Sequence, residues 1–189
     1  IIRKVFAAVF AGGHILLEDV PGVGKTTLAV AVSKILGLDY KRVQFTPDVL
    51  PADITGFSMY NAKTDSFEYR PGAAMTNLLL ADEINRTSPK TQSALLEIME
   101  EGSITVDGVT HPVPSPFIVI ATENPIGSSG TQLLPESQLD RFMICTSLGY
   151  PSHQDAITIL KDRTREQLTG LTPVLTAEEL ITIRRDVQN

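Results

Sequence analysis

A glycine-rich turn that runs into a lysine and a threonine lies in the stretch "DVPGVGKTTLAVAVSKILG", residues 19–37. Backbone amides exposed in such a turn can point at phosphate oxygens, and the N-terminus of a following helix favours an anion. Lys25 can reach β- and γ-phosphates, and the Thr26 hydroxyl is suited to Mg²⁺. The predicted phosphate site consists of Pro21, Gly22, Val23, Gly24, Lys25, Thr26 and Thr27. The alternative is a helix that begins with Gly-Lys-Thr by chance, since Asp19 stands where the full motif has another glycine.

Two adjacent carboxylates close the apolar run "LLLADE". Asp82, at the end of a predicted strand, is placed to hold Mg²⁺, and Glu83 can accept a proton from an attacking water. Carboxylates after strands also cap helices, which is the alternative interpretation. Their occurrence downstream of the phosphate motif favours the catalytic one.

Polar residues also follow the next predicted strand, in "IATENP". The Asn124 amide can orient a lytic water and sense a γ-phosphate, whereas Thr122 and Glu123 are expected to support the site. The alternative for Asn124 is an Asn-Pro turn, in which asparagine is favoured by local hydrogen bonds.

An arginine in "ESQLDRF" is a candidate to act on a neighbouring subunit. Arg141 is expected to reach a neighbour's γ-phosphate in a ring, which is worth about 10³-fold or more in rate. The alternative is a surface arginine paired with Asp140 or Glu136. Arg86 is a second candidate, whose alternative is a pairing near the start of a helix.

Strands alternate with helices along the chain, which indicates a parallel sheet with right-handed crossovers. Ligands bind such sheets beyond the carboxyl ends of the strands, where the residues above are expected to meet. The predicted strands are 14–20, 40–45, 77–83, 116–125 and about 142–148, and the predicted helices are 1–11, 25–36, 89–101 and about 135–140. Hairpins are predicted at 57–72 and 103–113, the second turning at Asp107-Gly108, and 46–56 is predicted to be a loop.

The composition limits the classes of protein to which this chain can belong. The 189 residues are 42% hydrophobic with a net charge of −6, which favours one globular domain and argues against nucleic acid as a partner. The single cysteine, Cys145, is predicted to be buried, and the three histidines show no zinc spacing. We expect no membrane span and no secretory signal. Because the chain starts at Ile1 and stops within a helical pattern, we expect a piece of a longer intracellular protein.

These residues together resemble the MoxR family of AAA+ ATPases. The resemblance rests on "LLEDVPGVGKTTLA", "FEYRPGAAMTNLLLADEINRTSPKTQSALLEIMEEG", "IATENP" and "LPESQLDRF", and extends to about Tyr150. It implies an α/β, three-layer P-loop AAA+ core with two β-hairpin insertions at 1–149, followed at 150–189 by the beginning of a small helical lid. In that family the position of Asp19 is usually acidic.

The resemblance also implies ATP as nucleotide and Mg²⁺ as metal. Asp82 and Glu83 would form the Walker B pair, Asn124 would be sensor 1, and Arg141 would be the arginine finger acting in trans. The implied protein is a cytoplasmic chaperone or remodeller that forms a hexameric ring. Its implied partners carry von Willebrand factor A domains. The sensor 2 arginine of the family lies later in the lid than Arg184 and Arg185.

Three other functions stay open. A nucleic-acid motor would need a basic pore hairpin, but 103–113 has no lysine or arginine, and 57–72 has acidic residues beside its two bases. A non-hydrolysing nucleotide switch or scaffold would not need Asp82, Glu83 and Asn124. A magnesium-chelatase-like ATPase subunit shares the architecture, although "EINRTSPKTQSALLEIMEEG" fits MoxR better.

Overall fold

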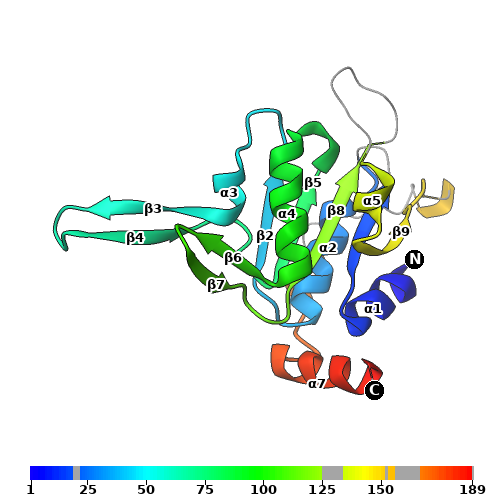
Figure 1. The fold of residues 1–189 in the computed structure, drawn as a ribbon. Coiled ribbons are helices and arrows are strands. Elements are labelled where there is room, and N and C mark those ends of the chain that lie inside the picture. The colour runs from blue at the N-terminus through cyan, green and yellow to red at the C-terminus, as the bar shows by residue number, and fades with distance from the viewer. Residues whose placement is uncertain (19–21, 125–133, 152, 156–166, 189) are drawn as a thin grey trace.

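A sheet of five parallel strands forms the centre of the molecule (Figure 1). The structure is a computed structural model that describes residues 1–18, 22–124, 134–151, 153–155 and 167–188. The strands are β1 (His14–Glu18), β2 (Tyr40–Gln44), β5 (Leu78–Asp82), β8 (Ile118–Glu123) and β9 (Phe142–Thr146). Their spatial order is β2-β5-β8-β1-β9, and every neighbouring pair is parallel. The predicted α/β parallel-sheet fold is therefore confirmed.

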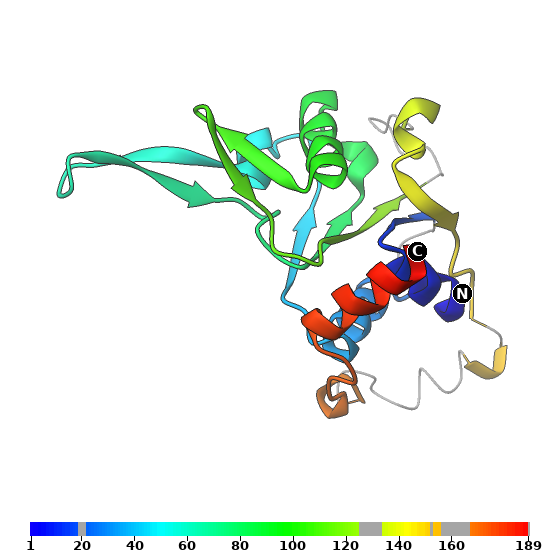
Figure 2. The same ribbon diagram turned by 60° about the horizontal axis from the view of Figure 1, so that its bottom comes forward.

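Helices cover both faces of this sheet (Figure 2). α1 (Ile2–Ala11), α2 (Lys25–Ile35) and α7 (Ala177–Gln188) lie on one face, and α4 (Pro89–Glu101) lies on the other. Successive strand residues point to opposite faces, so Ile15 and Leu17 pack with the α1–α2 side and Leu16 packs with the α4 side. Burial on both faces explains why the central strands are continuous apolar runs.

The sequence around α4 sets its two ends. The Ser88 hydroxyl accepts a hydrogen bond from the Thr91 amide at 3.3 Å, and Pro89 occupies the first helical position. Gly102 ends the helix in the left-handed conformation, with φ +63°. The predicted helix over 89–101 has these bounds.

The segment predicted as loop at 46–56 contains a short helix instead, α3 (Pro51–Thr55). Pro51 stands in its first turn, where its missing N–H costs nothing. The Asp53 carboxylate accepts a hydrogen bond from the Leu50 amide at 2.8 Å. Of the two prolines that suggested a loop, Pro51 starts this helix, whereas Pro47 lies in the turn before it.

Two antiparallel hairpins project from the α4 side of the sheet (Figure 1). The longer pairs β3 (Gly56–Asn61) with β4 (Ser66–Pro71), and the shorter pairs β6 (Ser103–Val106) with β7 (Val109–Pro112). Both agree with prediction, and Asp107 and Gly108 have positive φ in the second turn. The Tyr69 and His111 rings stack with centroids 3.9 Å apart, so the two hairpins contact each other.

Near the C-terminus, α7 packs on α1 through the buried Leu180, and the Arg184 Nε donates to the Val9 carbonyl at 2.9 Å.

At the edge of the sheet, the prediction for Cys145 is wrong. Cys145 is exposed, and it lies on β9, which is an edge strand of the sheet. Across the described ranges, no helix has both the length and the apolarity needed to cross a bilayer.

Candidate functional site

The predicted site residues of β1, β5 and β8 lie where these parallel strands end. Asp82 is the last residue of β5, Asn124 follows β8 directly, and the phosphate motif joins β1 to α2. Because parallel strands end at the same edge, the sheet itself gathers these segments. Pro21, at the start of the predicted phosphate site, lies outside the described residues.

The turn before α2 has the backbone that phosphate binding needs. Gly22 and Gly24 have φ values of +89° and +95°, which residues with a Cβ rarely adopt, and a Cβ at either position would meet no atom within 4 Å. Val23 lies between them, half-buried, and α2 begins at Lys25. The amides of this turn and the helix N-terminus therefore border open space.

A cavity of about 350 Å³ lies over this turn. Its lining residues are Gly22, Gly24, Lys25, Thr26, Thr27, Arg42, Gln44, Asp82 and Glu83. The cavity thus brings the phosphate motif together with the two predicted carboxylates. It also includes two residues of β2, Arg42 and Gln44, that belong to no predicted site.

The Asp82 carboxylate is held on both oxygens. The Thr122 hydroxyl donates to Oδ1 at 2.6 Å, and the Arg42 Nη2 donates to Oδ2 at 2.5 Å. The Asp82 side chain is only 11% exposed, whereas that of Arg42 is 45% exposed. The arginine therefore reaches from the solvent side to a buried carboxylate.

Glu83 follows in the left-handed conformation, with φ +58°. The Thr122 hydroxyl oxygen accepts a hydrogen bond from the Glu83 amide at 2.8 Å, so Thr122 links the two carboxylate residues. The Arg86 Nη1 lies 2.6 Å from Glu83 Oε2. Arg86 thus makes the pairing near a helix start that was the alternative for this residue.

Asn124 is tied to the segment after Glu83. Its backbone carbonyl accepts a hydrogen bond from the Asn85 Nδ2 at 3.3 Å. Asn85 is buried in the 3-10 helix η1 (Ile84–Arg86), which follows β5. The two segments are therefore fixed to each other at the carboxyl edge of the sheet, and the role of the Asn124 side chain stays a prediction.

A second pair of carboxylates lies at the same edge. Glu18 and Glu123 are register partners in β1 and β8, and Glu123 is 3% exposed. Burial raises the pKa of Glu123 from its ordinary 4.5 to about 7, and a hydrogen bond and charge repulsion from Glu18 act in the same direction. The neutral form of Glu123 is therefore favoured up to about neutral pH.

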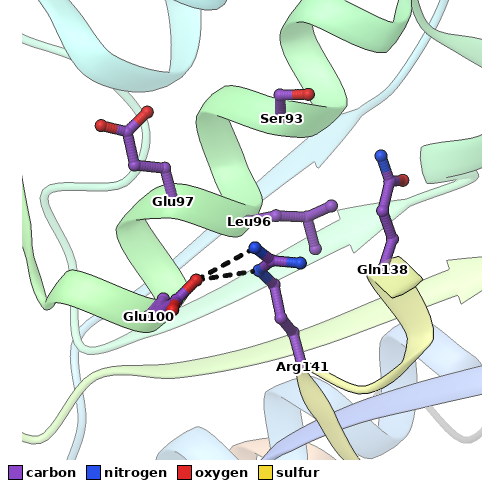
Figure 3. Close-up of a pocket in the computed structure, with 6 residues that line it drawn as sticks. All are labelled: Ser93, Leu96, Glu97, Glu100, Gln138 and Arg141. Carbon is purple, nitrogen blue, oxygen red and sulfur yellow. Dashed lines mark hydrogen bonds and ion pairs between the residues drawn. The ribbon is translucent and has the colours of Figure 1, made fainter.

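Arg141 lies apart from this cavity, on the α4 side of the sheet. It follows α5 (Glu136–Leu139), and its Nη2 lies 3.0 Å from Oε2 of Glu100 on α4. Figure 3 shows the two side chains directed at each other in a pocket of about 290 Å³. The pocket is lined by Ser93, Leu96, Glu97, Glu100, Gln138 and Arg141. The expected surface partners, Asp140 and Glu136, are not the ones that it takes.

The donors around the cavity suit a magnesium–nucleotide complex. Mg²⁺ is usually held by one or two protein oxygens together with substrate phosphates and water. Thr26 and Asp82 offer such oxygens in the lining of one cavity, together with Lys25. The residues present therefore fit the group that the sequence predicted.

Arg42 could not be found from a motif. Its signal in the sequence is a basic residue within the predicted strand "YKRVQF", which is also typical of a solvated strand face. Only the register of β2 beside β5, with Gln44 opposite Asp82, brings its side chain to the carboxylate.

Comparisons with known proteins agree with this arrangement. A family model described as "ATPase family associated with various cellular activities (AAA)" matches residues 14–144. YeaC of Bacillus subtilis is 57% identical over 97% of this chain and 58% of its own length. Chaperone MoxR1 of Mycobacterium tuberculosis is 43% identical over 85% of this chain and 42% of its own length.

A solved structure shows the same fold. It is a candidate ATPase from Cytophaga hutchinsonii, with a TM-score of 0.87 and 38% identity. The match covers 99% of this chain and 57% of that protein. The chain thus spans between two fifths and three fifths of the proteins that it resembles here.

Proposed function

Because the chain belongs to the MoxR family of AAA+ ATPases, we propose that it binds ATP with Mg²⁺ over the turn at Gly22–Gly24 and hydrolyses it to ADP and phosphate. One observation carries this proposal. Lys25, Thr26, Asp82 and Glu83 line a single cavity at the carboxyl edge of a parallel sheet. The predicted phosphate, metal and proton-accepting groups thereby face the same space.

Each side chain has a separate task in this proposal. Lys25 neutralises the β- and γ-phosphates, while the Thr26 hydroxyl and the Asp82 carboxylate hold Mg²⁺. When bound, the metal neutralises charge that develops on the phosphate oxygens. Glu83 accepts the proton of the attacking water, and Asn124 orients that water. Thr122 fixes the two carboxylate residues relative to each other.

Arg141 supplies the trans contribution. An arginine directed at the γ-phosphate of a neighbour stabilises charge in the transition state. A head-to-tail interface closes into a ring when its rotation permits, and we propose a hexamer. In the isolated chain Glu100 holds Arg141, so assembly exchanges that partner for the phosphate of the neighbouring subunit.

We also propose that hydrolysis drives a chaperone or remodelling activity in the cytoplasm, on partners that carry von Willebrand factor A domains. The relative named as a chaperone supports the activity. The projecting hairpin supports a protein partner, because Phe57, Tyr60 and Phe67 are 51%, 51% and 75% exposed on it.

The test is Mg-ATP turnover by the full-length protein, wild type beside Glu83→Gln and Lys25→Ala, with size-exclusion chromatography with and without Mg-ATP. Glu83→Gln should retain nucleotide binding and lose about 10²-fold or more in turnover, since only the proton acceptor is removed. Lys25→Ala should lose binding. Glu97→Gln, on exposed helix surface, is the matched control and should hydrolyse ATP normally.

Other outcomes identify the alternatives. Nucleotide binding without turnover in the wild type would favour a switch or scaffold. Turnover that appears only with a second subunit type present would favour a magnesium-chelatase-like protein. No binding of ATP by the wild type would overturn the proposal.

A further inference from the structure

Arg42 is the charged side chain of the cavity that the proposed hydrolysis does not use. It lies on β2, opposite Leu80 of β5, and its Nη2 donates to Asp82 Oδ2 at 2.5 Å and to Gln44 Oε1 at 3.0 Å. The same cavity is lined by Lys25, the other cation of its wall. Arg42 therefore shares one cavity with the phosphate turn and contacts the carboxylate that we propose to hold the metal.

The contact matters because it occupies Oδ2, the Asp82 oxygen that does not bond to Thr122. Asp82 Oδ1 already accepts the Thr122 hydroxyl, which leaves Oδ2 as the oxygen taken by Arg42. A charge-assisted bond of this length is strong for a hydrogen bond, and a guanidinium at this distance repels a divalent cation. Both effects oppose Mg²⁺ at Asp82 while Arg42 is in place.

The pair also has a physical cause that involves no ligand. Asp82 is 11% exposed on its side chain, and a carboxylate so far from water is destabilising without a partner. Arg42 has a side chain that is 45% exposed, so it can return to water at little cost. Gln44 already accepts a hydrogen bond from the same nitrogen, so Arg42 keeps one acceptor when it leaves the carboxylate.

We propose that Arg42 is an internal counter-ion that competes with Mg²⁺ for Asp82, so that loading the metal–nucleotide complex releases Arg42 from the carboxylate. This inference rests on the proposed function, because it assumes that Asp82 faces Mg²⁺. Arg42 is a positioning residue here: it sets the concentration of Mg²⁺ at which the site fills. It touches neither the reacting phosphate nor the attacking water in this role.

The experiment is a Mg²⁺ titration of the full-length protein with a fluorescent, non-hydrolysable ATP analogue, read as nucleotide binding. In Arg42→Met the Mg²⁺ concentration for half-maximal binding should fall roughly threefold to tenfold, because a positive charge next to the carboxylate is removed. Arg42→Lys keeps the charge and should stay near the wild type. Far-UV circular dichroism of each variant checks that it is folded.

Arg70→Met is the matched control. Arg70 is also a half-exposed strand arginine with an ion pair, at 3.3 Å to Glu68, but it lies on the projecting hairpin. Its Mg²⁺ requirement should equal that of the wild type. A fall of the same size in this variant would overturn the proposal, because the effect would then come from net charge.

Three further results would also overturn it. The first is an unchanged or higher Mg²⁺ requirement in Arg42→Met. The second is weaker ATP binding at saturating Mg²⁺ with ADP binding unchanged, which would assign Arg42 to the terminal phosphate instead. The third is an Arg42→Lys variant that behaves like Arg42→Met. A wild type that binds no nucleotide would be a failure of the proposed function, and is thereby distinguished from these.

Discussion

Arg86 Nη1 and Glu83 Oε2 lie 2.6 Å apart, within one turn of chain that follows β5. The Glu83 side chain is 19% exposed and that of Arg86 is 44% exposed, so the pair is partly in solvent. Arg86 holds the carboxylate that we propose as proton acceptor. The ion pair thus restrains Glu83 before any water can be activated.

Removal of this restraint should raise basal turnover. In Arg86→Gln the Glu83 carboxylate loses an ion pair worth about 0.2–1 kcal/mol, which corresponds to roughly a 1.4-fold to 5-fold rise in the ATPase rate of the unassembled protein. Nucleotide affinity should not change. Steady-state phosphate release at protein concentrations below assembly measures the effect. Lys90→Gln, an exposed change at the start of α4, is the control, and equal rates in both variants would refute the restraint.

Arg141 should matter only after assembly. Arg141→Ala is expected to spare nucleotide binding and to reduce the turnover of the assembled full-length protein about 10³-fold, because a trans arginine is removed from the transition state. Turnover measured across a range of protein concentrations separates the two states. Loss of folding or of nucleotide binding in the unassembled variant would contradict the trans role.

A substitution of Glu100, the ion-pair partner of Arg141, should have the opposite effect on assembly-dependent turnover. Glu100→Gln removes the carboxylate that holds Arg141 within its own subunit, at 3.0 Å, and should lower the protein concentration at which turnover becomes cooperative. Glu97 lines the same pocket, so Glu97→Gln is the matched control (Figure 3). Indistinguishable concentration dependence in these two variants would show that Glu100 does not restrain Arg141.

Thr122 should contribute to stability as well as to the site. Thr122→Val keeps the shape but leaves the Glu83 amide and the Asp82 carboxylate without the hydroxyl, which should cost about 1–3 kcal/mol in the free energy of unfolding. Urea denaturation measures this, and Thr122→Ser should recover most of it. Thr105→Val, in an exposed hairpin pair with Thr110, should stay within about 0.5 kcal/mol of the wild type. Equal losses at the two sites would contradict the role of Thr122.

The Glu18–Glu123 pair predicts a pH dependence of stability. Because the folded-state pKa of Glu123 is raised to about 7 from 4.5, its contribution to stability is fully present below about pH 4.5 and is lost as the pH rises through about 7. Glu123→Gln mimics the protonated carboxyl and should be more stable than the wild type at pH 8, by roughly 1–3 kcal/mol. Near pH 4 the two proteins should match.

Thermal unfolding from pH 4 to pH 8 measures this difference. Burial lowers the pKa of His14 from its ordinary 6.5, but His14 is present in both proteins and its effect cancels in the comparison. Glu97→Gln serves as an exposed-carboxylate control. A constant difference between wild type and Glu123→Gln at all pH values would show that Glu123 does not titrate in this window.

Local sequence was enough to place the phosphate turn and the carboxylates. Gly24 and Lys25 follow one apolar strand and Asp82 ends another, and all parallel strands in a sheet end at one edge, so their meeting follows from topology. The hairpin that turns at Asp107-Gly108 could also be predicted from the sequence, because the preference of Asp-Gly for such a turn depends on local residues alone.

Contacts between side chains of different strands and helices could not be predicted from local sequence. The contact between Arg42 and Asp82 depends on which strand lies beside β5, and no local pattern encodes that neighbour. Cys145 was placed in the core for the same reason, since an apolar strand does not reveal that it forms an edge. Arg141 takes Glu100 rather than an adjacent acid because α4 lies against its strand in space.

The stacked rings of Tyr69 and His111 connect the two hairpins mechanically. Glu83 is followed by η1 and α4, and β6 begins directly after Gly102, so only short turns separate these segments. Because His111 stacks on Tyr69, the shorter hairpin packs against the longer one. We expect a rotation of α4 to be passed through this stack to the longer hairpin, which projects away from the sheet (Figure 2).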